Sequence, residues 1–64
     1  MDTTQKLTYI VVARDKGLIH LTWAEQELVQ ATLHGRRAHP DVRPGLTIDE
    51  IYQSRINELQ NLDL

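Results

Sequence analysis

The chain contains no cysteine. It therefore cannot form a disulfide or bind zinc through thiolates, two devices that often support very small domains. Sixty-four residues form one domain at most, and a chain of this length removes only about 60% of its extended surface from water on folding. We therefore expect association with a second molecule to contribute to its stability.

Long hydrophobic runs are also missing. The longest apolar run, Tyr9 to Ala13, is far too short to cross a bilayer. Met1 is followed by Asp-Thr-Thr-Gln, not by the basic segment and apolar run of a secretory signal. These features, with the lack of cysteine, predict a cytoplasmic protein.

Neither sign of charge is in large excess. Seven Lys and Arg against nine Asp and Glu give a net charge of −2, which argues against a polyanion as the main partner. The distribution is uneven, because the segment from Arg36 to Arg43 carries a net +2 and the rest of the chain −4. A local anion site on an acidic body therefore stays open.

The apolar pattern of the N-terminal third predicts a β-hairpin over residues 6–22. Two runs rich in β-branched and apolar residues flank Arg14 to Gly17, where Asp15 and Lys16 suit a type I turn and Gly17 a bulge. Alternation assigns one set of side chains to the core face: Leu7, Tyr9, Val11, Ala13, Ile19 and Leu21. The opposite face carries Ile10, Val12, Leu18 and His20, and is too apolar to be turned wholly to water.

Two helices should follow, over residues 23–34 and 47–62, separated by a loop over residues 35–46. Each helix begins with a T-x-x-E capping box, at Thr22 and at Thr47. Gly35 ends the first helix, and two prolines favour an extended loop. The predicted fold is a single α+β domain of ββαα order.

Two helices on one face of the hairpin would leave Ile10, Val12 and Leu18 for a partner, so we expect a homodimer or a complex with a larger protein. His20 lies on the same face, either as a partly buried histidine or as a pH-sensitive contact. Trp23 would cover the end of the hairpin or anchor a partner.

The loop contains Arg36, Arg37 and Arg43, which could bind phosphate or carboxylate groups through forked hydrogen bonds. It has no aromatic residue for base stacking and no Gly-rich phosphate cradle. We interpret it as a solvated connector, and a contact with protein carboxylates or with nucleic acid remains an alternative.

A DNA-binding function is the second hypothesis. Leu21, Thr22 and Glu25, with Leu28 and Val29 behind them, resemble the first half of the winged-helix effector domains of response regulators. The resemblance covers Val11 to Leu59 and implies a DNA-binding regulator. The recognition helix and wing of that family have no counterpart in this chain.

No reaction or metal is indicated. His34, His39 and Asp41 are close in sequence, but a proline-containing loop does not establish the fixed geometry of a zinc site. Ser54 has no evident base, and helix capping or solvent exposure explains Glu50 and Glu58. The sequence therefore predicts a small non-enzymatic interaction or regulatory module without metal or cofactor.

Overall fold

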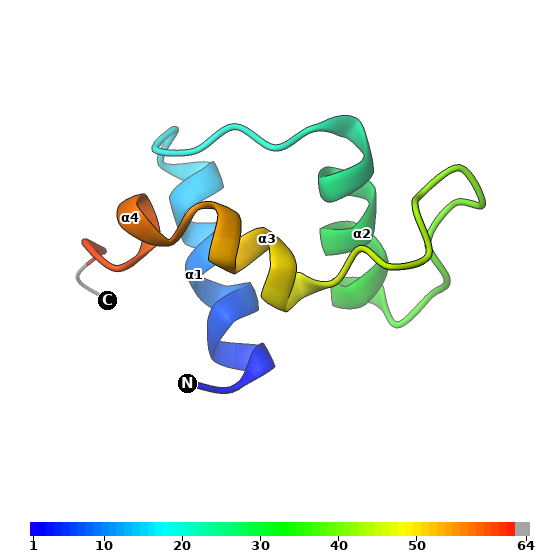
Figure 1. Cartoon of the computed structure of the whole chain (residues 1–64), viewed down its shortest axis with the longest axis horizontal. Coiled ribbons are helices and arrows are strands. Elements are labelled where there is room, and N and C mark those ends of the chain that lie inside the picture. Colours follow the sequence, from blue (N-terminus) through cyan, green and yellow to red (C-terminus); the bar gives the residue numbers. More distant parts are fainter. Residues whose placement is uncertain (63–64) are drawn as a thin grey trace.

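The chain folds as an all-helical protein in the computed structural model, which describes residues 1–62 (Figure 1). The helices are α1 (Thr3–Asp15), α2 (Trp23–His34), α3 (Ile48–Ser54) and α4 (Ile56–Leu59). No strand is present in this part of the chain. The predicted α+β fold is therefore wrong, and α1 and an irregular connection replace the hairpin over residues 6–22.

Helix α1 is capped by hydrogen bonds at both ends. The Asp2 carboxylate accepts a bond from the Gln5 N–H, and the Gln5 side chain accepts one from the Asp2 N–H, at 2.8 and 3.1 Å. At the other end, the Leu18 N–H bonds to the Ala13 carbonyl at 2.9 Å, while Gly17 adopts a φ of +74°. This is the glycine-terminated helix end in which a left-handed residue satisfies the last carbonyls. Gly17 therefore ends a helix and does not form a hairpin bulge.

Packing against α3 overrides the β propensity of α1. Ile10 and Ala13 are fully buried in the core that α1 and α3 share. The rings of Tyr9 and Tyr52 meet edge to face, with their centroids 6.5 Å apart. Tertiary contacts of this kind commonly outweigh the modest preference of Val, Ile and Thr for strands.

The connection between α1 and α2 explains part of the hairpin error. Ile19 is buried and Leu21 packs on the core, whereas Leu18 and His20 are exposed. This alternation is that of an extended chain. The predicted hairpin pairing is absent, because residues 3–15 are helical.

Helix α2 has the predicted bounds and the predicted caps. The Glu25 N–H donates to the Thr22 hydroxyl at 3.2 Å, and the Thr22 N–H donates to the Glu25 carboxylate at 2.9 Å. Gly35 takes a left-handed φ of +64°, and the Arg36 N–H bonds to the Ala31 carbonyl. Helices α1 and α2 thus end in the same glycine motif.

The single helix predicted over residues 47–62 is divided into α3 and α4. The Thr47 hydroxyl accepts the predicted bond from the Glu50 N–H at 3.1 Å. The reciprocal half of the capping box is not found within residues 1–62, and the Glu50 carboxylate accepts a bond from Arg43 instead. The helix is interrupted at Arg55, where φ is −119° and ψ is 19°. This interruption accompanies the hydrogen bonds that the Arg55 side chain makes to the carbonyl of His20 and the carboxylate of Glu25.

Helix α3 lies between α1 and α2 and contacts both of them (Figure 1). The core that it completes contains Ile10, Ala13, Ile19, Val29, Ile48, Ile51, Tyr52 and Leu59. Ile10 and Ala13 mark the side of α1 that faces α3, and no element within residues 1–62 covers the opposite side. The arrangement therefore leaves α1 packed on one side only.

Candidate functional site

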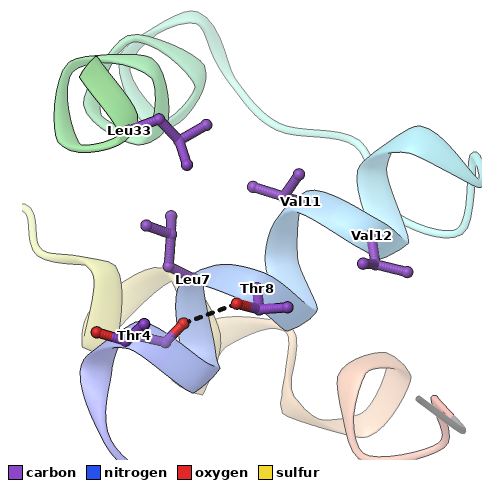
Figure 2. Close-up of a pocket in the computed structure, with 6 residues that line it drawn as sticks. All are labelled: Thr4, Leu7, Thr8, Val11, Val12 and Leu33. Carbon is purple, nitrogen blue, oxygen red and sulfur yellow. Dashed lines mark hydrogen bonds between the residues drawn. The ribbon is translucent and has the colours of Figure 1, made fainter.

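An apolar groove lies between α1 and the last turn of α2, on the side of α1 away from α3 (Figure 2). Its volume is about 240 Å³. Leu7 and Val11 of α1 point toward Leu33 of α2 across the opening. The remaining lining residues are Thr4, Thr8 and Val12.

Leu33 is the most unusual residue of the groove. Its side chain is 47% exposed, although Leu is the kind of residue that a helix normally turns toward its core. Leu7, Val11 and Val12 are only partly buried. The groove is therefore an apolar surface that the described part of the chain leaves open.

A second hollow of about the same volume flanks the other side of Thr4 and Thr8, next to Gln5 and Tyr9. Thr4, Thr8 and Val12 follow one another at intervals of four residues, so they form a ridge along the helix surface. We call these three residues the α1 ridge. The ridge stands between two hollows and is bordered by apolar or uncharged side chains.

The polar group of Thr8 is already satisfied within the helix. Its hydroxyl donates to the Thr4 carbonyl at 3.0 Å (Figure 2). A partner could therefore cover this part of the ridge without leaving a buried hydroxyl unpaired, which would cost about 1 to 3 kcal/mol.

Charge is nearly absent from α1 between Thr3 and Ala13. The one charged residue in this range is Lys6, and it is directed at α3. Its ammonium lies 3.1 Å from the Asp49 carboxylate and 5.7 Å from the centroid of the Tyr52 ring. The open side of α1 is thus uncharged over most of its length.

The arginines of the predicted anion site are mostly engaged by the chain itself. Arg36 makes two hydrogen bonds to the Glu27 carboxylate, at 2.6 and 3.1 Å, and Arg43 makes one to Glu50 at 2.6 Å. No ion pair of Arg37 is found within residues 1–62. In all, five of the seven Lys and Arg side chains are paired with carboxylates in this part of the chain.

The loop over residues 35–46 is consequently held at several points. The hydrogen bonds from Arg36 lower the pKa of Glu27 to about 2 against the effect of burial, and the His39 N–H bonds to the same carboxylate at 3.0 Å. The same pairing raises the pKa of Arg36. Val42, near the tip of the loop, is buried. Contact with protein carboxylates is therefore made, but those carboxylates belong to the same chain.

A further ion pair, of Arg55 with Glu25, connects three segments. The guanidinium bonds to both carboxylate oxygens, at 3.0 and 2.5 Å, and also to the carbonyl of His20 at 3.1 Å. Burial raises the pKa of Glu25, but the hydrogen bonds from the Thr22 backbone and from Arg55 lower it more, so that it lies below its ordinary value. Arg55 also donates to the Ser54 hydroxyl at 2.6 Å, which gives that serine a structural role.

The residues predicted for an interface are dispersed. Ile10 is fully buried in the core, and Val12 lines the groove. Leu18 and His20 are exposed on the α1–α2 connection, and Trp23 is 60% exposed beside His39. Of this set, only Val12 lies on the candidate site.

The other groove residues were not identified from the sequence as interface residues. Thr4, Leu7, Thr8, Val11 and Leu33 come together only once α1 is a helix. The signals that could have found them are the helix start at Asp2-x-x-Gln5 and the helix end at Gly17. They are of the same kind as the signals that mark the two ends of α2.

The histidines and acidic residues do not form a metal centre in the described residues. The Nδ1 atom of His39 accepts a hydrogen bond from the Asp41 N–H at 3.1 Å. No group of three His, Asp or Glu side chains within residues 1–62 is arranged to hold an ion. Among the described residues, no helix combines the length and the apolar character needed to span a bilayer.

No protein-family model, curated protein or solved structure matches this chain. The candidate site therefore rests on the geometry of the groove and of the α1 ridge.

Proposed function

We propose that the chain is a small non-enzymatic interaction module, whose groove between α1 and α2 receives an apolar surface of another protein molecule. The observation that carries this proposal is the half-exposed Leu33, which faces Leu7 and Val11 across an uncharged groove. Exposed apolar surface of this kind is a common mark of protein interaction sites.

The charge distribution supports a protein partner over a polyanion. A nucleic acid is bound mainly through unpaired Lys and Arg side chains. Arg36 and Arg43 are paired with carboxylates, and the open side of α1 is uncharged over most of its length. The DNA-binding regulator is therefore the weaker proposal. Action in the cytoplasm remains part of the proposal and rests on the sequence alone.

The proposal can be tested by measuring whether the groove is covered in living cells. Because the chain lacks cysteine, a Thr8→Cys variant carries one thiol, at the centre of the α1 ridge. A membrane-permeant maleimide should label this thiol several-fold more slowly in cells than in dilute purified protein.

A Gln53→Cys variant is the matched control, because Gln53 is exposed on α3 and does not line the groove. Its labelling rate should be similar in the two settings. Equal rates for the Thr8→Cys thiol in cells and in dilute solution would contradict the proposal.

A further inference from the structure

We infer that the molecule received by the groove is a second copy of this chain, with the two α1 helices packed antiparallel about a two-fold axis near Thr8. This inference rests on the proposed function, since it names the partner of the same site. Its basis is that the uncovered side of α1 carries the α1 ridge with a hollow on each side of it. The ridge of a second copy could therefore enter one of these hollows.

The shape of the surface is self-complementary. A two-fold interface brings the same patch of both molecules together, so each protrusion must find a hollow in an identical surface. The α1 ridge has a hollow of about 240 Å³ on each side. Rows of side chains spaced by four residues pack into the grooves of a second helix in the commonest class of helix contact.

The absence of charge along the ridge favours the same arrangement. Any charge near a two-fold axis would face its own copy, and like charges in contact are unfavourable. From Thr3 to Ala13 the sole charge is Lys6, and Asp49 pairs with it away from the ridge. The centre of the contact would therefore contain uncharged side chains alone.

The ends of the helix are complementary in charge. Asp2 lies at the N-terminus of α1 and Lys16 at its C-terminus, and neither makes an ion pair within residues 1–62. Antiparallel packing directs Asp2 of each copy toward the Lys16 end of the other. It also sets the two helix dipoles in opposite directions, which is favourable.

The area of the contact makes the dimer a weak one. A standard interface takes about 800 Å² from each partner, whereas the whole accessible surface of the chain is 4292 Å². One face of a helix of 13 residues, with Leu33 beside it, supplies less than that. We therefore expect a dissociation constant of about 10 to 500 µM for the dimer, in the range of small transient interfaces.

Sedimentation equilibrium across that concentration range tests the inference with two matched variants. Thr8→Arg places two charges beside the axis and should raise the dissociation constant of the dimer at least about tenfold. Thr32→Arg is the control, because Thr32 is also an exposed helical threonine whose hydroxyl bonds to the carbonyl four residues earlier, at 2.8 Å. It does not line the groove and should leave the constant within about twofold.

A cross-linking measurement gives a second readout that does not depend on a destabilising change. Two helices in contact have their helix axes about 8 to 10 Å apart. Residues near the two-fold axis of the dimer are therefore within reach of a disulfide. Under mild oxidation at about 100 µM, a concentration within the range expected for this weak interface, Thr8→Cys should therefore form a covalent dimer, and Thr32→Cys should not.

Three outcomes would overturn the inference. They are a wild-type monomer at the highest concentration, equal dissociation constants for Thr8→Arg and Thr32→Arg, or equal cross-linking of the two cysteine variants. A monomer whose Thr8→Cys thiol is still protected in cells would refute the second copy and leave the proposed function standing. A monomer whose thiol is unprotected there would refute both.

Discussion

At the scale of single residues, most charged side chains hold the fold together and do not present a site. Arg36, Arg43 and Arg55 each contact a carboxylate of another segment. They differ in how much water surrounds the pair. The side chains of Arg55 and Glu25 are 22% and 13% exposed, against 59% and 47% for Arg43 and Glu50. We therefore expect unequal contributions to stability.

Replacement of Arg55 by alanine should lower the free energy of unfolding by about 1.5 to 3 kcal/mol, the usual value of hydrogen bonds to a charged group. The variant loses bonds to Glu25 and to the His20 carbonyl together. Urea unfolding measures the difference. Arg43→Ala should cost less than about 1 kcal/mol, since its pair is open to solvent. Equal losses in the two variants would contradict this account.

Acid should weaken the protein partly through Glu27, whose pKa is lowered from 4.5 to about 2 by its bonds with Arg36. A carboxylate with a lower pKa in the folded state stabilises that state above its ordinary pKa and loses this effect as the pH falls through the folded value. The contribution of Glu27 should therefore decline between about pH 4.5 and pH 2.

The thermal midpoint, measured from pH 7 to pH 2, reports this decline. In a Glu27→Gln variant the midpoint should be lower at pH 7 and fall less steeply below pH 4.5 than in the wild type. Glu58→Gln removes the same charge at an exposed position that makes no ion pair within residues 1–62. A Glu27→Gln curve parallel to that of the wild type would exclude this carboxylate as a source of acid sensitivity.

At the scale of elements, short hydrogen-bonding signals at helix ends proved more informative than the apolar pattern between them. The start of α2 is correctly predicted by Thr22 with Glu25, and its end by Gly35. Asp2 with Gln5 marks the start of α1, and Gly17 follows its end, by the same kinds of signal. The run from Leu7 to Ala13 instead predicts a strand, because it is rich in β-branched residues and includes a tyrosine. Both faces of such a strand would carry apolar side chains.

The rest of the fold could not be predicted from local pattern. Ile10 and Ala13 face the core because α3 arrives there from some forty residues along the chain. The division of α3 from α4 coincides with the contact of Arg55 with Glu25, again a long-range contact. Of the residues that line the candidate site, the sequence predicts only Val12 as an interface residue. The other lining residues become neighbours through the helical period of α1, which differs from the period of a strand.

The cap of α1 gives a direct test of helix against hairpin. Asp2→Ala should lower the free energy of unfolding by about 1 kcal/mol, because one side-chain bond to the first turn is lost. Asp2→Asn should retain most of the stability, since an asparagine oxygen accepts the same bond. Chemical denaturation compares the three proteins. Asp2 would lie outside a hairpin of residues 6–22, so an unchanged Asp2→Ala variant would argue against the N-terminal helix.

At the scale of the whole molecule, internal charge pairing determines which partners the surface suits. Five of the Lys and Arg side chains are already paired with carboxylates within residues 1–62, so few remain to replace the counterions of a nucleic acid. Fluorescence anisotropy with a labelled DNA duplex should show no binding tighter than about 100 µM at physiological salt, weaker than typical non-specific DNA binding. A tight complex that weakens steeply with salt, and is lost in Arg37→Ala, would restore the DNA-binding hypothesis.

The central position of α3 also governs the order in which the molecule can be assembled. Helices α1 and α2 are made first, yet the element that contacts both of them begins only at Ile48. A growing chain must therefore hold two capped but largely unsupported helices until α3 leaves the ribosome. During that interval Ile10 and Val29, later sealed in the core, are open to chaperones and proteases.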